Sequence, residues 1–266
     1  MSSMCRTEKN ADYAEKNAIY PKAEKKKIFY GKLISYLRYY HRISEEEDGG
    51  RMKAASIYWM NTKKLENEAC FLKYYEILSP ARRKKVDSCL QLKDKRLSLA
   101  TGILLDRGLA AYGLCERNAA VVYGENGKPR LPQYPHIHFS LSHSGNRAMA
   151  VFADVETGCD IEKMQKANMK LAEKFFTLKE YTYIEEQGTA EKQDEAFCRL
   201  WTLKESFVKV IGDCSVLPRD SFEVTISPNE RIRVSQNIDN ASYYFEEYRL
   251  EGYFAAVCFR RERAYG

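Results

Sequence analysis

The order of the predicted secondary structure is the feature that most limits how this chain can fold. Strands, helices and strands follow one another twice, once before and once after about residue 155. A long helix over 88–112 precedes strands within 137–154, and helices within 169–211 precede strands within 222–260. Because a sheet must bury its apolar face against another layer, this order predicts an α+β fold of two halves packed together. The halves share no strict sequence repeat.

Length and composition fit a soluble globular protein. The 266 residues can form one large domain or two modest ones, and 44% of them are hydrophobic and 30% charged. No apolar stretch approaches the ~20 residues of a membrane span, and we see no secretory signal. We therefore expect a cytoplasmic protein without a membrane partner. The eight cysteines form no Cys-x-x-Cys pair, which predicts reduced, mostly buried thiols.

The net charge of +6 is too small to indicate a general nucleic-acid binder, so we expect no nucleic-acid partner. It fits a local basic patch for phosphates or for an acidic partner. A basic RNA-binding module built on Arg82–Lys85 and the tyrosines is an alternative that no RNA motif supports.

Residues 1–51 are rich in Lys, Tyr and Asn. Apolar residues at helical spacing predict one helix around Lys27–Arg42, followed by a solvated loop. We interpret this segment as a poorly ordered extension; a membrane-surface helix and a translation start at Met52 are the alternatives. The expected organisation is an extension over 1–51, an N-terminal half over 52–155 and a C-terminal half over 156–266.

Two short segments carry most of the chemistry. In Gly158-Cys-Asp-Ile-Glu162, the two carboxylates lie one residue apart and so share a face of the predicted strand. A third carboxylate, Glu205, lies on a predicted helix with Lys209 one turn further on. Three acids and a lysine are the groups that a magnesium-bound diphosphate needs around it.

These segments resemble the signatures of the Sfp-type 4'-phosphopantetheinyl transferases, Gly-x-Asp-x-Glu and Trp-x-x-Lys-Glu-Ser/Ala-x-x-Lys. Both are complete here, with Cys159 where Val or Ile is usual. The resemblance covers roughly residues 54–260. It implies two similar halves packed as a pseudo-dimer with coenzyme A between them. It also implies transfer of the 4'-phosphopantetheine arm to a serine of an apo carrier protein, which releases 3',5'-ADP.

The resemblance assigns Mg²⁺ to the three acids Asp160, Glu162 and Glu205. The matching lysine, Lys209, contacts the phosphate arm in the family; the alternative is a surface ion pair with Glu205. Lys204 points elsewhere on the helix, where a structural or orienting role is as plausible as a catalytic one.

Further positions match family contacts to coenzyme A. Ser142 and His143 match the Ser-His that contacts its phosphates, and Lys128 lies in a Gly-Lys-Pro loop near the nucleotide. Three basic residues fall where the family binds the 3'-phosphate, although ordinary solvated helix faces are the alternative: Arg82, Lys85 and Arg96.

Glu180 matches a carboxylate assigned to activating the serine, which makes it a general-base candidate. It could instead be a helix-start acid beside the positive end of the helix dipole, and a metal-bound water competes for the role of base. The expected partners are coenzyme A and an acidic acyl or peptidyl carrier protein, with the enzyme a monomer. An inactive coenzyme A-binding or carrier-binding protein of the same fold is the alternative function. Fatty-acid, polyketide and nonribosomal-peptide carriers all remain open.

Overall fold

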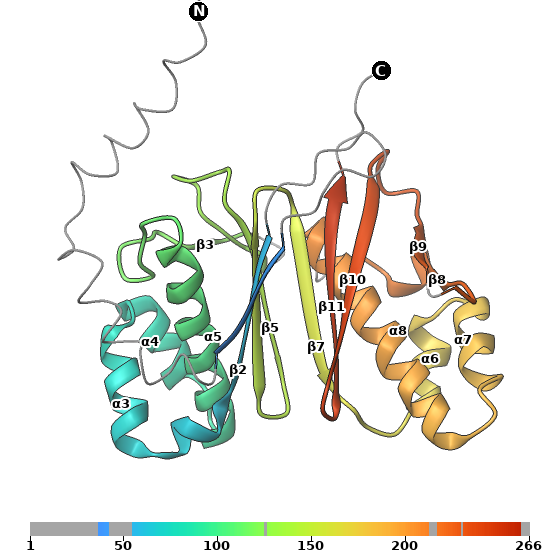
Figure 1. Cartoon of the computed structure of the whole chain (residues 1–266), viewed down its shortest axis with the longest axis horizontal. Coiled ribbons are helices and arrows are strands. Elements are labelled where there is room, and N and C mark those ends of the chain that lie inside the picture. Colours follow the sequence, from blue (N-terminus) through green and yellow to red (C-terminus); the bar gives the residue numbers. More distant parts are fainter. Residues whose placement is uncertain (1–36, 43–54, 125–126, 213–216, 230, 262–266) are drawn as a thin grey trace, which may run out of the picture.

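The computed structural model describes residues 37–42, 55–124, 127–212, 217–229 and 231–261. Its elements form two halves that lie side by side, each with a sheet turned toward the middle of the molecule and helices on the outside (Figure 1). The α+β prediction is therefore confirmed. No helix within the described ranges has the length and apolar character needed to cross a membrane.

The first half pairs a four-stranded antiparallel sheet with three helices. The sheet has the order β1-β2-β6-β5. Its strands are β1 (Leu37–Arg42), β2 (Ala55–Asn61), β5 (His138–Ser144) and β6 (Arg147–Ala153). The other elements are η1 (Thr62–Glu66), α3 (Glu68–Ile77), α4 (Pro80–Asp87), α5 (Leu92–Ala110) and a small hairpin of β3 (Val122–Tyr123) and β4 (Pro129–Arg130).

The second half repeats this plan. Its main sheet has the order β10-β11-β7 and is antiparallel. The strands are β7 (Thr157–Lys163), β10 (Ser242–Leu250) and β11 (Tyr253–Arg261), with a hairpin of β8 (Glu223–Ile226) and β9 (Ile232–Ser235). The remaining elements are α6 (Met169–Phe175), α7 (Leu178–Glu185), α8 (Ala190–Ile211) and η2 (Arg219–Ser221).

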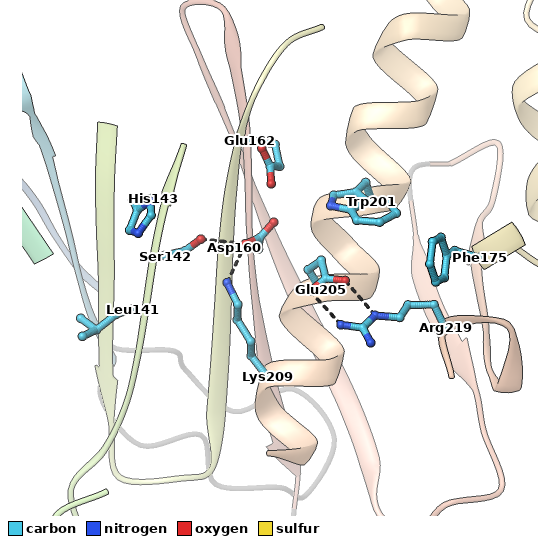
Figure 2. A pocket seen from close by; sticks show the side chains of 10 residues that line it. All are labelled: Leu141, Ser142, His143, Asp160, Glu162, Phe175, Trp201, Glu205, Lys209 and Arg219. Carbon is cyan, nitrogen blue, oxygen red and sulfur yellow. Dashed lines mark hydrogen bonds and ion pairs between the residues drawn. The ribbon is translucent and has the colours of Figure 1, made fainter. Parts of the chain in front are cut away.

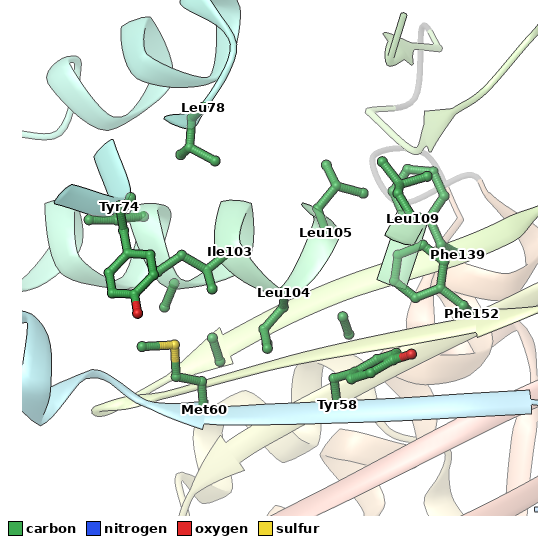
Figure 3. Close-up of a cluster of buried hydrophobic side chains, with 14 of the residues drawn as sticks. Tyr58, Met60, Tyr74, Leu78, Ile103, Leu104, Leu105, Leu109, Phe139 and Phe152 are labelled. Atoms are coloured by element: carbon green, nitrogen blue, oxygen red, sulfur yellow. The ribbon is translucent and has the colours of Figure 1, made fainter. Parts of the chain in front are cut away.

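Three apolar clusters hold these layers together. One packs α5 against the first sheet, where Leu104 and Phe152 are fully buried (Figure 3). A second packs α8 against the second sheet around Phe207. The third joins the two sheets to each other and includes Trp59 and Ile161. Because each sheet buries both faces, the two halves form one continuous core rather than separate units.

The helix expected around Lys27–Arg42 is wrong over its last six residues. Leu37–Arg42 form β1, which pairs with β2 from Leu37 opposite Met60 to Arg42 opposite Ala55. The spacing of apolar residues is compatible with a helix, but the neighbouring strand offers backbone partners that local propensity does not include. Residues 27–36 lie outside the described part, and the boundary at residue 51 stays a prediction.

Candidate active site

A pocket of about 580 Å³ lies between the two halves. Figure 2 shows its walls, which come from β5, β7, the end of α6, α8 and η2. The lining residues are Leu141, Ser142, His143, Asp160, Glu162, Phe175, Trp201, Glu205, Lys209 and Arg219. The structure thus brings together six residues that the sequence predicts for one site, from both halves of the chain.

Gly158 explains how the strand acids reach the helix residues. A Cβ at this position would lie 2.2 Å from the backbone oxygen of Ser206 and 2.4 Å from the backbone nitrogen of Val210. Such distances are impossible for any side chain, so only glycine lets β7 lie directly against the backbone of α8. This close approach sets Asp160 and Glu162 beside Glu205 and Lys209.

Lys209 pairs across the site with the strand acid. Its Nζ lies 2.7 Å from Asp160 Oδ1. Burial alone would lower the pKa of Lys209, but the Asp160 carboxylate outweighs that effect and raises it above the ordinary value. The pair therefore differs from the predicted alternative, a surface ion pair of Lys209 with Glu205.

Glu205 has a different cationic partner, Arg219. Its two carboxylate oxygens receive the guanidinium Nε at 3.0 Å and Nη2 at 3.4 Å. Sequence reasoning missed Arg219, since it lies 14 residues after Glu205 and belongs to no recognised pattern. Only the tertiary structure, in which η2 packs against α6, brings it into the pocket.

Serine side chains join β5 to β7 and hold the two strand acids. Ser142 Oγ donates to Asp160 Oδ1 at 2.7 Å, and Ser144 Oγ donates to Glu162 Oε2 at 2.7 Å. The hydroxyl oxygens of Ser140, Ser142 and Ser144 also accept hydrogen bonds from the backbone N–H groups of Cys159, Ile161 and Lys163, at 3.1, 3.4 and 3.1 Å. Sequence reasoning singled out only Ser142, although the alternation of serines along one strand face was a usable signal.

The donor set fits a hard divalent cation. Asp160 Oδ2 is buried and has no hydrogen-bond partner among the described residues, which leaves one carboxylate oxygen available. Burial and the adjacent Asp160 carboxylate raise the pKa of Glu162 to about 6, as expected where acids crowd together. Yet within the described ranges no three Asp, Glu, His or Cys side chains are gathered closely enough to hold a metal. Lys209 and Arg219 hold two of the acids instead.

The residues predicted to contact the nucleotide differ from one another in their burial and in the partners that they already have. His143 lies at the exposed rim, and desolvation with the charges of Lys209 and Arg82 lowers its pKa. Arg82 is buried, and its Nη2 donates to the Ser98 carbonyl at 3.1 Å while its Nε has no partner among the described residues. Its guanidinium is therefore only partly satisfied, and Arg82 does not line the pocket.

The other three basic candidates do not line the pocket. Lys85 is exposed and places its Nζ over the Tyr123 ring at 4.7 Å. Arg96 lies 4.0 Å from Glu66. Lys128 is buried and donates to Glu156 at 2.6 Å and to the Val210 carbonyl at 3.0 Å, which ties its loop to the end of α8.

Glu180 lies in the core of the second half rather than in the pocket. Its side chain is 1% exposed, and both of its oxygens lie 2.7 Å from Lys204 Nζ. It also closes a capping box with Thr177 at the start of α7. This geometry argues against a general base and favours the helix-start alternative, and it makes Lys204 a structural residue.

Known proteins to which this chain is similar are 4'-phosphopantetheinyl transferases. The family described as the 4'-phosphopantetheinyl transferase superfamily matches residues 156–258, which include the acids of the pocket and Lys209. The 4'-phosphopantetheinyl transferase Sfp of Bacillus subtilis (strain 168) is 30% identical over 209 residues, 78% of this chain and 92% of that protein. The 4'-phosphopantetheinyl transferase ffp of Bacillus subtilis is 32% identical over 186 residues, 69% of this chain and 83% of that protein.

Among solved structures, a holo-(acyl-carrier-protein) synthase from Bacillus anthracis str. Ames is 14% identical and has a TM-score of 0.36, covering 40% of this chain and 96% of that one. The two sequence relatives each span most of this chain and most of their own length. The chain therefore belongs to the Sfp-type 4'-phosphopantetheinyl transferase family.

Proposed function

We propose that the protein transfers the 4'-phosphopantetheine arm of coenzyme A to a serine hydroxyl of an apo acyl or peptidyl carrier protein. The serine oxygen forms a bond to the phosphorus that bears pantetheine. The bond from that phosphorus to the bridging oxygen breaks, 3',5'-ADP leaves with that oxygen, and the proton of the serine hydroxyl passes to solvent. The observation that carries this proposal is the pocket between the halves, where three carboxylates face a lysine.

Asp160, Glu162 and Glu205 would hold Mg²⁺, and the unpartnered Asp160 oxygen supports this assignment. When bound, the ion would neutralise charge on the diphosphate as the phosphorus–oxygen bond breaks. Lys209 is held charged in the pocket, so its ammonium can bind a diphosphate oxygen and keep the phosphorus in line with the serine. Holding the ion and binding the diphosphate both require side chains in one place, and the three acids and Lys209 all line the same pocket.

The 3'-phosphate of coenzyme A would lie toward the first half. Arg82 has a buried Nε without a partner in the described part of the chain, and a phosphate oxygen could accept its hydrogen bond. His143 at the rim is the second candidate, and Lys85 beside Tyr123 is the third. Arg96 and Lys128 are weaker candidates, because each already faces a carboxylate, Arg96 that of Glu66 and Lys128 that of Glu156.

We further infer a cytoplasmic enzyme that acts as a monomer, since one chain supplies both walls of the pocket. Carrier proteins of this class are acidic, and a net charge of +6 suits their approach by electrostatic steering. The sequence and the fold leave open which carrier is modified, so a panel should include fatty-acid, polyketide and nonribosomal-peptide carriers.

The test is incubation of the full chain with each apo carrier, coenzyme A and MgCl₂, followed by intact mass spectrometry of the carrier. We expect a phosphopantetheine adduct that is absent when the carrier serine is replaced by alanine. Glu205→Gln should slow transfer at least ~100-fold, because a metal supplies several kcal/mol of transition-state stabilisation. Glu251→Gln, the same chemical change at an exposed turn, is the matched control.

No adduct on any carrier would remove the proposal. Tight coenzyme A binding without transfer would instead support the alternative, an inactive binding protein of the same fold. The intact set of pocket acids favours the enzyme over that alternative.

A further inference from the structure

Arg219 enters the pocket from η2 and binds the acid that the cation needs. Its guanidinium meets both oxygens of Glu205, with Nε 3.0 Å from Oε1 and Nη2 3.4 Å from Oε2. The third nitrogen, Nη1, donates to the Leu217 carbonyl at 3.3 Å, which fixes the plane of the guanidinium. The two side chains are 20% and 16% exposed, so this ion pair is shielded far more than a surface pair.

The same arrangement recurs at the neighbouring acid. Lys209 holds Asp160 at 2.7 Å, so two of the three predicted metal ligands carry a cation from the chain itself. The described residues accordingly contain no ready group of three acidic, histidine or cysteine ligands. A guanidinium that is bidentate on Glu205 uses a lone pair of each carboxylate oxygen, and its charge repels a divalent cation brought to the same oxygens, so a cation that takes this carboxylate must displace it.

We propose that Arg219 is an internal counter-cation of Glu205. Its guanidinium holds this carboxylate in the ligand-free enzyme and moves away from it when the divalent cation binds. The proposal rests on the proposed function in one respect, the assignment of Glu205 as a metal ligand. Its consequence is that free cation binds weakly, because binding must break a shielded bidentate pair. A metal that arrives with a diphosphate binds better, because the diphosphate offers the displaced guanidinium new oxygens in the same pocket.

The experiment measures cation binding directly, without carrier and without turnover. Mn²⁺ is the probe, and the signal of free Mn²⁺ in electron paramagnetic resonance gives its dissociation constant for the full chain. Arg219→Met removes the charge and the fork while keeping an unbranched side chain. We expect Mn²⁺ to bind about 3- to 10-fold more tightly to this variant, the effect of one positive charge next to a partly shielded site. Lys179→Met, at an exposed lysine of the same half, should leave the constant unchanged.

Coenzyme A provides the second readout. In the wild type, adding coenzyme A should tighten Mn²⁺ binding by a larger factor than in Arg219→Met, because only the wild type gains a new partner for the released guanidinium. Coenzyme A with Mn²⁺ but no protein corrects for direct complex formation. Arg219→Gln serves as the neutral variant if Arg219→Met shows a lowered melting temperature in circular dichroism.

Equal or weaker Mn²⁺ binding by the neutral variants would overturn the proposal. Failure of wild type and variants alike to bind millimolar Mn²⁺ would overturn it together with the metal assignment. Transfer to carriers is measured separately, so its failure removes the proposed function while the Mn²⁺ comparison stands. Normal transfer with unchanged Mn²⁺ binding removes only the role of Arg219.

Discussion

The buried ion pair of Glu180 and Lys204 gives the sharpest prediction about the fold. Lys204 has three N–H donors and all three are used, on Glu180 Oε1 and Oε2 at 2.7 Å each and on the Phe222 carbonyl at 2.9 Å. Glu180 also accepts from the backbone N–H groups of Thr177 at 2.8 Å and Val224 at 2.6 Å. One pair thus ties the start of α7, the middle of α8 and β8 together.

Removing one partner leaves the other charged in the core. Lys204→Met keeps the length of the side chain but strands the Glu180 carboxylate with only its two backbone donors. Both side chains are 1% exposed, so water cannot replace the lost contacts. The free energy of unfolding should fall by ~3–5 kcal/mol, and Glu180→Gln should cost a similar amount. The double variant Glu180→Leu with Lys204→Met should recover at least half of the single-variant loss, since an apolar pair carries no unmatched charge.

Urea denaturation followed by circular dichroism measures these changes as shifts of the midpoint at constant slope. Lys179→Met is the control, because this lysine pairs with Glu223 while 82% exposed and should cost under ~1 kcal/mol. Transfer assays below the unfolding transition separate structure from chemistry. Glu180→Gln should keep its kcat per folded molecule. Unchanged stability together with a kcat loss of ~100-fold or more would refute this reasoning and restore the general-base role.

Two further predictions concern β7 and the residue that precedes it. Gly158→Ala should lower the melting temperature and weaken Mn²⁺ binding together, because a Cβ would push β7 away from α8. A variant that lost stability but bound Mn²⁺ as before would contradict the claim that the close approach of β7 to α8 positions the site. Glu156 is desolvated, but the hydrogen bond from His138 and the charge of Lys128 outweigh burial and lower its pKa from 4.5 to about 2. Its contribution to stability is therefore complete above pH 4.5 and lost toward pH 2. Glu156→Gln should be less stable than the wild type by ~1–3 kcal/mol at pH 7, with the gap closing near pH 2; an equal gap at both pH values would argue otherwise.

The features that sequence predicted correctly have a local physical basis. Alternation along a strand puts Asp160 and Glu162 on one face, and one helical turn puts Glu205 near Lys209, whatever the remainder of the chain does. The cap of α4 is equally local, since Ser79 directly precedes Pro80 and its side chain accepts a hydrogen bond from the Arg82 backbone nitrogen. Such patterns are complete within a few residues, so no knowledge of the tertiary structure is needed.

The features that sequence missed depend on partners distant along the chain. Glu180 and Lys204 are 24 residues apart in the sequence. How α7 packs on α8 decides whether Glu180 contacts substrate or Lys204. Lys128 reads locally as a loop lysine, yet its ammonium ends beside the Val210 carbonyl, 82 residues away. Arg219 belongs to no motif at all. Charged side chains are long and can satisfy several partners, so their contacts follow the packing and cannot be predicted before it.

The join between β5 and β7 explains why the pocket lies where it does. Neighbouring strands usually meet through backbone hydrogen bonds, but here serine hydroxyls accept from the N–H groups of β7. Two of these hydroxyls also donate to the strand acids, Ser142 to Asp160 and Ser144 to Glu162. The first half therefore orients the acids from one side, while α8 approaches them from the other through Gly158. A site held in this way from both sides needs both halves in register, which is the physical reason for one chain to contain them both.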